Sequence, residues 1–496
     1  MAARAGAGLQ GRASGKEGQF HLLLLMVGAL VLRLSFGMPY YLPGDSLNYL
    51  NAFEAFGRPG LANTLHITRL GMVLPLGVLQ FLCFGVHPLL QLFPLACSVA
   101  AVFLVYQLAR DLGGPTAGLL AGGLMAAVPM EVVYVPVLLP DTPLSLLALL
   151  AYWLLVRGQA GWRSALAAGL CLGLAYTCKE TALFFAGPAL LQAYWRRQDA
   201  RDAAWLAFGV AAVVLVEVGV LWLWLGTPHF RILQTLGFAY GSKGQFAAVE
   251  HHAGWWLAQV WLKLGALFWA AHPPTAALLL GLPHLVVWAL VRLGRQGMLW
   301  WPACWLAVWW GQQLVLSTIE PEPRYLQAGL PYAALLVGVG LASWWSARPV
   351  ATRVMLVAPA LVLCLAGAGL FKFAFAPRAA ATQALYERFR ALAVEEPAAL
   401  VGGPSEYVLR LAEYAGLQTP LSRPGAALTH WARLSSGYSK EESETGPPAG
   451  MAACMKEQFA LRFQEWYQRL GAVPAVGLSS TAELYCRASA PASPTR

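Results

Sequence analysis

Long, continuous apolar segments are the feature of this sequence that most constrains its fold. A helix needs about 20 mostly apolar residues to cross the hydrocarbon core of a bilayer, and several segments of the chain approach that length. Backbone amides cannot stay unpaired in lipid, so segments of this kind must be helical, and their continuous character excludes a transmembrane barrel. The composition agrees, because 58% of residues are hydrophobic and only 12% are charged, whereas soluble domains carry about 25% charged residues. The sequence predicts a polytopic α-helical membrane protein.

The basic excess follows the apolar segments. The net charge is +10. Many of the basic residues lie in short gaps between apolar runs, for example Arg110, Arg157, Arg196 and Arg292. If these gaps are cytoplasmic, the positive-inside rule accounts for much of the excess. We therefore expect membrane lipids with anionic headgroups as partners of these side chains, and no nucleic acid.

Hydropathy and charge asymmetry predict about eleven spans, with the N-terminus cytoplasmic. Arg33 and the lack of a small-residue cleavage site favour an uncleaved first span over a signal peptide. An outer loop is expected at 39–69, and segment 70–86 either lies along the interface or packs against the bundle. The spans are expected at about residues 20–38, 88–108, 115–131, 142–156, 164–177, 181–195 and 204–225, with three or four more within 256–372.

The composition becomes polar near the C-terminus, which divides the chain into a transmembrane domain (1–375) and an extracytoplasmic domain (376–496). Stretches such as YERFRALAVEEP and KEQFALRFQEWYQRL predict helices, and AALVGG and PAVGL predict short strands. A small α/β domain is expected. Whether Cys454 and Cys486 pair in it stays open, because spacing alone does not determine geometry.

Four clusters of polar residues at span edges stand out, because ionisable groups are costly there and tend to be functional. On the inferred topology, all four fall on the outer face. Each has a simpler explanation: helix capping for the two Asp residues, snorkelling or mutual pairing for Lys and Glu, and interfacial anchoring for Arg. The clusters are Asp45 with Tyr49, then Asp141, then Lys179 with Glu180, and lastly Glu320 with Glu322, Arg324 and Tyr325.

Taken together, the clusters suit a reaction on a lipid-linked phosphate in one outer cavity. Arg offers a planar fork that matches phosphate oxygens, and Lys adds a compact charge. A nearby carboxylate can take a proton from an attacking hydroxyl.

The order of these motifs resembles that of the GT-C fold glycosyltransferases, specifically the bacterial branch related to protein O-mannosyltransferases and lipid A aminoarabinose transferases. GDSLNYLNAFEAF is similar to the Asp-Glu-x-x-Tyr pattern of that family, and the resemblance extends over about residues 20–345. The further matching motifs are RLGMVLPLGVLQFLCFG, YQLARDLGGPTAGLLAGGLMAAVP, LLPDTPLSLLALLAYW, GLAYTCKETALF and PRYLQAGLPYAALL.

The resemblance implies an inverting transferase that moves a sugar from a polyprenyl-phosphate donor to an acceptor hydroxyl on the outer face of a bacterial inner membrane. Asp45 corresponds to the catalytic carboxylate, and Asp141 to the acidic residue that orients acceptor or donor. Lys179 and Arg324 would hold the donor phosphate, with Tyr325 supporting Arg324. The expected cavity wall comprises Tyr49, His66, Arg69, Glu180 and Glu320.

One departure from the family concerns metal binding. Many relatives carry two adjacent acidic residues in the first loop, whereas Ser46 follows Asp45 here. Hard cations favour several carboxylate oxygens, so the departure weakens a divalent-cation role and leaves the base role of Asp45 intact. The sequence therefore identifies no cofactor, and a divalent cation is left as an open alternative.

Two other functions remain as alternatives. A secondary transporter also carries rare charges and broken helices, but its substrate site is expected near the midplane. A non-catalytic scaffold is the second alternative. Its best support is the missing second acidic residue of the first loop, where Ser46 stands instead. The acceptor, whether glycan, lipid or protein, is not predicted, and the C-terminal domain is either its recognition module or a stabilising cap.

Overall fold

The computed structural model describes most of the helical part of the chain and portions of its C-terminal region. The described residues are 15–37, 49, 52, 65–82, 87–158, 161–197, 199–226, 231–232, 287–288, 291, 299–313, 323–345, 349, 362, 364–366, 368–369, 380–403, 408–409, 411–412, 415–420, 427–436, 447–448, 451–460 and 479–487.

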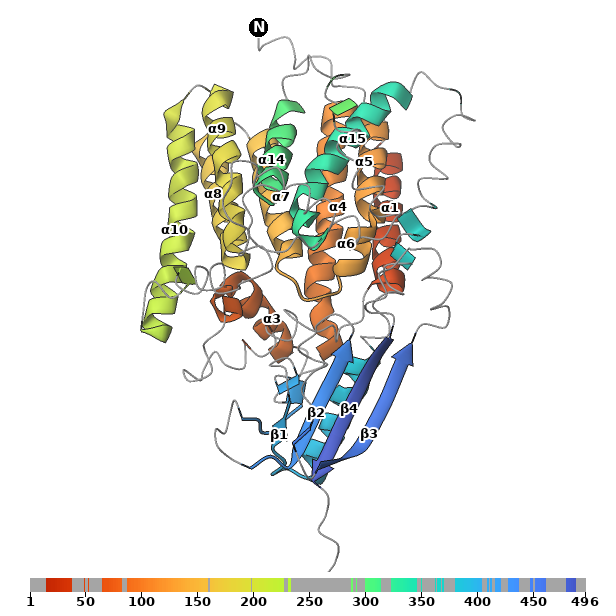
Figure 1. Cartoon of the computed structure of the whole chain (residues 1–496). Coiled ribbons are helices and arrows are strands. Elements are labelled where there is room, and N and C mark those ends of the chain that lie inside the picture. Colours follow the sequence, from red (N-terminus) through yellow and green to blue (C-terminus); the bar gives the residue numbers. More distant parts are fainter. Residues whose placement is uncertain are drawn as a thin grey trace, which may run out of the picture.

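A bundle of roughly aligned helices forms the larger part of the molecule (Figure 1). Its largest cluster of buried apolar side chains includes a group of large aromatic residues, among them Trp305 and Trp309. The long helices are α1 (Gly15–Phe36), α4 (Leu92–Gly113), α5 (Pro115–Ala127), α7 (Asp141–Arg157), α8 (Trp162–Cys178), α9 (Ala186–Arg197), α10 (Ala200–Leu225), α14 (Trp300–Gly311) and α15 (Leu330–Trp345). Shorter elements connect them, namely η4 (His87–Gln91), α6 (Pro129–Tyr134), η5 (Glu180–Phe185) and η8 (Pro323–Gly329).

The helix positions agree with the apolar segments of the sequence. Every span predicted before residue 226 corresponds to a helix of the bundle. Within the described residues, four helices are long and apolar enough to cross a membrane: Gly18–Phe36, Leu89–Gly113, Ala200–Leu225 and Tyr325–Trp345. The chain is therefore an integral membrane protein by fold and composition. The total of about eleven spans stays a prediction, because most of 256–372 lies outside the described residues.

Close helix packing depends on small residues, as is usual in membranes. A Cβ atom added to Gly169 of α8 would lie 2.1 Å from the backbone oxygen of Leu206 in α10. The two backbones therefore meet with no room for a side chain. Outward-facing residues of α1, such as Leu23 and Leu34, are largely exposed, which suits a helix surface in contact with lipid.

Segment 70–82 forms helix α3 (Leu70–Leu82), which follows the short turn η3 (Leu65–Thr68). It lies at the end of the bundle that faces the sheet (Figure 1). One face, including Met72 and Val73, is buried, while Val78 and Phe81 are exposed. Of the two arrangements that the sequence left open, packing against the bundle is the one observed, through contacts with α8.

A four-stranded mixed sheet forms the lower part of the molecule (Figure 1). It contains β1 (Val401–Gly402), β2 (His430–Ser436), β3 (Met451–Ala460) and β4 (Ser479–Arg487), in the order β1-β2-β4-β3. The β1–β2 pair is parallel and the other two are antiparallel. A helix over 380–395 precedes the strands, and Phe389 shares an apolar core with Val401 and Leu484. That core continues into Tyr49, Ile67 and Met72, so the sheet region packs on Tyr49, η3 and α3.

The C-terminal region differs in part from the prediction. The helix expected from YERFRALAVEEP and the strand expected within AALVGG are confirmed, whereas PAVGL lies outside the described residues. The helix expected from KEQFALRFQEWYQRL is wrong over 456–460, which belong to β3. Pairing with β4, where Lys456 lies opposite Glu483, overrides the local helical pattern. Cys454 and Cys486 form a disulfide between these two strands. The boundary at 376 and a separate α/β domain stay predictions.

Candidate active site

The first turn of α7 carries a buried ion pair. The Asp141 carboxylate accepts a hydrogen bond from Lys179 Nζ at 2.8 Å, and the two residues are 1% and 7% exposed. The residue before the helix is Pro140, and no side chain caps this end. Helix capping therefore does not explain Asp141, whose carboxylate pairs instead with the side chain that follows α8.

Tyr325 joins this pair from a third part of the chain. Lys179 Nζ lies 4.4 Å from the centroid of the Tyr325 ring, which η8 supplies. A cation over an aromatic face is attracted to the ring, and the attraction is larger where water is excluded. Three predicted site residues from distant segments are thus in contact, although Tyr325 supports Lys179 here.

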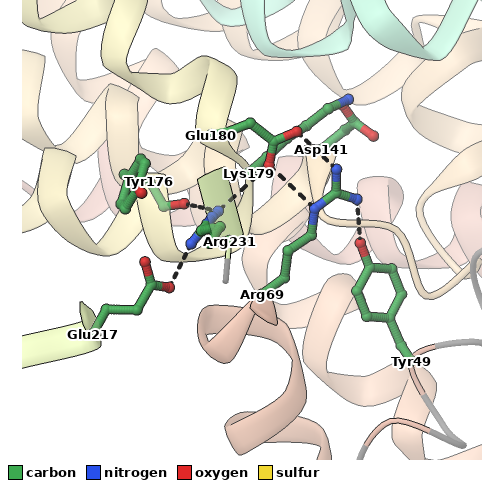
Figure 2. Close-up of polar contacts among 8 residues, drawn as sticks. All are labelled: Tyr49, Arg69, Asp141, Tyr176, Lys179, Glu180, Glu217 and Arg231. Atoms are coloured by element: carbon green, nitrogen blue, oxygen red, sulfur yellow. Dashed lines mark hydrogen bonds and ion pairs between the residues drawn. The ribbon is translucent and has the colours of Figure 1, made fainter. Parts of the chain in front are cut away.

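Arg69 organises a second group beside the first (Figure 2). Its guanidinium donates to the two Glu180 oxygens at 3.0 and 3.4 Å, and its Nη1 donates to Tyr49 Oη at 2.6 Å. The Tyr49 ring meets His66 edge-on, with centroids 5.1 Å apart. These four residues were predicted to line one cavity wall, and the structure brings them together. Arg69 and Tyr49 are buried, so their geometry is well constrained.

Close backbone contact positions Arg69. A Cβ atom on Gly71 would lie 2.4 Å from Thr177 Oγ1 and 2.7 Å from Cys178 Sγ. Only glycine lets the start of α3 approach the end of α8 so closely. Because Glu180 follows this end of α8, the contact places Arg69 beside it.

Neighbours in sequence separate in space at Lys179 and Glu180. Lys179 has extended backbone angles (φ −156°, ψ 131°) where α8 ends, and in extended chain successive side chains point to opposite sides. Lys179 therefore bonds to Asp141, while Glu180 bonds to Arg69. The alternative that these two neighbours simply pair with each other is wrong.

Sequence reasoning missed Arg231 and Glu217, which extend the second group. Arg231 Nη1 lies 2.5 Å from Glu217 Oε1, and its Nη2 donates to the Tyr176 backbone oxygen at 2.6 Å. The same Nη2 lies 3.5 Å from Glu180 Oε2, and the guanidinium stacks over the Tyr176 ring at 4.2 Å. Glu217 had a usable signal, since it is an acidic residue inside an apolar run. No sequence pattern distinguished Arg231, whose backbone is helical in the structure.

Three predicted residues are not placed by this geometry. Asp45 and Glu320 lie outside the described residues, as does the Arg324 side chain, whose backbone belongs to η8. No group of three or more His, Cys, Asp or Glu side chains close enough to hold a metal ion occurs in the part of the chain that is described.

The arrangement concentrates opposite charges at one end of the bundle. Three cationic side chains, Lys179, Arg69 and Arg231, alternate with the carboxylates of Asp141, Glu180 and Glu217 (Figure 2). Buried, hydrogen-bonded cations of this kind can bind a phosphate oxyanion more strongly than exposed ones, because the local dielectric constant is low.

Comparison with known proteins gives both a family match and a set of similar folds. Residues 85–224 match the family model described as dolichyl-phosphate-mannose-protein mannosyltransferase. No curated protein sequence matches the chain. Among solved structures, ArnT from Cupriavidus metallidurans bound to undecaprenyl phosphate is 15% identical and gives a TM-score of 0.59, over 95% of this chain and 98% of that one.

A second group of similar structures comes from an archaeon. The oligosaccharyltransferase AglB of Archaeoglobus fulgidus, in complex with an inhibitory peptide and a dolichol-phosphate, is 12% identical with a TM-score of 0.52. The match covers 86% of this chain and 70% of that one. The chain has the GT-C fold. The predicted resemblance to GT-C fold glycosyltransferases is thus confirmed. The mannosyltransferase family match, together with the shared fold, also confirms the glycosyltransferase class.

Proposed function

We propose that this GT-C protein moves a sugar from a polyprenyl-phosphate donor to an acceptor hydroxyl, with inversion at the anomeric carbon and Asp45 as the base. The acceptor oxygen bonds to the anomeric carbon, and the bond from that carbon to the phosphate oxygen breaks. The hydroxyl proton passes to Asp45, and polyprenyl phosphate leaves.

The observation that carries the proposal is the convergence of charged side chains at one end of the bundle. Lys179 contacts both Asp141 and Tyr325. Arg69, Glu180 and Arg231 lie beside the Asp141–Lys179 pair (Figure 2). A structural role alone does not require so many buried charges. The free energy lost by removing charges from water is often larger than the free energy gained from their mutual attraction. A leaving phosphate uses the cations directly.

Several cationic side chains bind the donor phosphate in this proposal. Lys179 and Arg324 hold the donor phosphate, as the resemblance implies, and Arg69 and Arg231 add two guanidinium groups to the same side. Asp141 orients Lys179 through the 2.8 Å hydrogen bond, and Tyr325 confines it from the other face. The ArnT match supports a lipid-phosphate donor, because ArnT binds undecaprenyl phosphate in the solved complex.

The reaction takes place on the outer face of the membrane in this proposal, in a bacterial inner membrane with the N-terminus cytoplasmic. The Cys454–Cys486 disulfide supports an extracytoplasmic C-terminal region, since disulfides persist in oxidising compartments. The site lies at the end of the bundle where that region packs. The lipid tail of the donor then stays in the bilayer while its sugar reaches the surface.

The test uses membranes that contain the wild-type chain or Asp45→Asn, supplied with radiolabelled polyprenyl-phosphate sugars one at a time. Transfer of label out of the donor lipid is measured. We expect transfer by the wild type with at least one donor, and a loss of about 100-fold or more in the variant. The matched control is Asp111→Asn, since Asp111 pairs with Arg157 at the far end of α7.

The outcomes separate the parts of the proposal. Equal transfer by wild type and Asp45→Asn removes Asp45 as the base but keeps the enzyme class. Equal losses in Asp45→Asn and Asp111→Asn indicate general damage to the fold. No transfer by the wild type, with cell-envelope extract added as an acceptor source, overturns the proposed donor.

A further inference from the structure

A second buried polar network lies next to the site and is not used by the proposed chemistry. Arg33 Nε donates to Ser98 Oγ at 2.8 Å, and Ser98 Oγ donates to Glu131 Oε2 at 2.8 Å. Gln327 Nε2 donates to Glu131 Oε1 and to Thr142 Oγ1, both at 3.1 Å. These five side chains are at most 2% exposed and belong to α1, α4, α6, η8 and α7.

The Gln327 amide directs its NH2 group at two acceptors. The Glu131 carboxylate sits 3.8 Å from the Arg33 guanidinium and, when ionised, can only accept hydrogen bonds. In the structure the NH2 group of Gln327 faces this carboxylate. The same group also donates to Thr142, so the amide links η8 to α7, which is remote from it in sequence.

The two segments that Gln327 bridges each carry a site residue. Thr142 follows Asp141 in the first turn of α7, and Gln327 is two residues after Tyr325 in η8. Asp141 and Tyr325 approach Lys179, the first by hydrogen bond and the second through its ring. The position of both groups around Lys179 thus depends on the relative position of α7 and η8.

Hydrogen bonds from tryptophan side chains to backbone oxygens also hold η8. Trp309 Nε1 donates to the backbone oxygen of Tyr325 at 2.8 Å, and Trp310 Nε1 lies 3.4 Å from the backbone oxygen of Leu326. Indoles from α14 therefore hold the backbone of η8, and Gln327 holds it through its side chain. The Arg33 guanidinium anchors the network by donating to the Ala29 and Ala126 oxygens, each at 3.0 Å.

We propose that Gln327 is a positioning residue, which the buried Arg33–Ser98–Glu131 chain holds in place so that η8 and α7 keep Tyr325 and Asp141 around Lys179. The proposal rests on the proposed function for its effect on transfer. It does not require Gln327 to touch the donor. A displacement of about 1 Å in a reacting site can lower a rate by about 100-fold.

The first arm of the test needs no transfer reaction. Gln327→Leu, Lys179→Met and the double variant are purified in detergent, and the midpoint of thermal unfolding is measured for each. If Gln327 orders the surroundings of Lys179, the double variant loses less than the sum of the two single losses, by about 2 °C or more. Additive losses overturn the proposal, even if no donor has been found.

The second arm measures kcat and KM for the donor. We expect Gln327→Leu to lower kcat about 10- to 100-fold with KM changed less than about 3-fold, because the donor-binding cations remain. The matched control is Gln192→Leu, another buried glutamine, which accepts from Trp305 Nε1 at 3.0 Å. It should lose stability and keep kcat. Equal kcat losses in both variants, or an unchanged kcat in Gln327→Leu, overturn the proposal.

If the wild type transfers no sugar, the proposed function fails and the unfolding cycle still decides the positioning role. If Gln327→Leu does not fold, Gln327→Asn replaces it in both arms, since its shorter amide cannot reach both acceptors without moving η8.

Discussion

The two ends of helix α7 carry the same kind of ion pair in opposite settings. At the start, the paired side chains of Asp141 and Lys179 are 2% and 9% exposed. At the end, about 25 Å away for 17 residues, Arg157 and Asp111 are 37% and 31% exposed. Water screens the exposed pair, so it contributes little to stability. The buried pair has lost its hydration, so each charge depends on the other.

The largest effect is expected from breaking the buried pair on one side. Lys179→Met leaves Asp141 buried without its cation, which should lower the free energy of unfolding by about 3–5 kcal/mol. Chemical unfolding in detergent measures this loss. A matched replacement of both partners, Asp141→Leu with Lys179→Met, should restore all but about 1 kcal/mol while transfer stays absent. If the double variant is as unstable as Lys179→Met, packing rather than charge explains the loss.

A smaller effect is expected at Glu180, which is 21% exposed and faces two guanidiniums. Glu180→Gln keeps the shape but leaves Arg69 and Arg231 to repel each other, at a cost of about 1–3 kcal/mol. Unfolding of the variant at low and high salt is the measurement. Added salt should recover part of the loss, since it screens the repulsion. A loss that salt does not change would mean that hydrogen bonding, not charge, dominates there.

The sheet offers a carboxylate in a third setting and a test by pH. Burial raises the pKa of Glu483, but hydrogen bonds from Lys456 and Arg433 outweigh it, so the pKa is lowered from its ordinary value. A lowered pKa contributes stability above the unfolded-state value near pH 4.5, and that stability is lost as the pH falls through the folded-state value. We expect the unfolding midpoint of the wild type to drop in that acid range. Glu483→Gln should flatten the drop, and an unchanged profile would contradict this assignment.

The smallest effect is expected at the exposed end of α7. Arg157→Met removes the bond from Arg157 Nη2 to Asp111 Oδ1, which is 2.9 Å long, and should cost about 0.2–1 kcal/mol. Unfolding and transfer measured together test the contrast with Lys179→Met. A loss above about 2 kcal/mol would show that the two ends of the helix are more alike than their exposure indicates.

The sequence predicted which charged residues lie close together better than it predicted how they pair. Asp141, Lys179 and Arg69 interrupt long apolar runs, and this interruption is visible without a structure. Pairing depends on which helices are neighbours, and hydropathy carries no information on that. Lys179 and Glu180 show the point, since one backbone conformation sends adjacent side chains to different partners.

Other residues were missed for physical reasons of their own. Glu131 and Glu217 are acidic groups within apolar segments, so their signal was present. Gln327 carries no charge, and its bridge to Thr142 depends on a contact 185 positions apart. In the C-terminal region, local helical periodicity at 456–460 lost to strand pairing with β4, a long-range interaction that sequence patterns do not reveal.

The apolar core that the sheet region shares with Tyr49 and α3 has a practical consequence. Tyr49 and Met72 pack in the same apolar cluster as Phe389 and Leu484, and Tyr49 accepts the hydrogen bond from Arg69. A chain shortened to residue 375 would leave Tyr49 and Met72 facing water, and the shortened protein would lose activity whether or not the missing part selects the acceptor. Acceptor choice should therefore be mapped with single substitutions on the solvent side of the sheet, such as at Lys456, which leave this shared core intact.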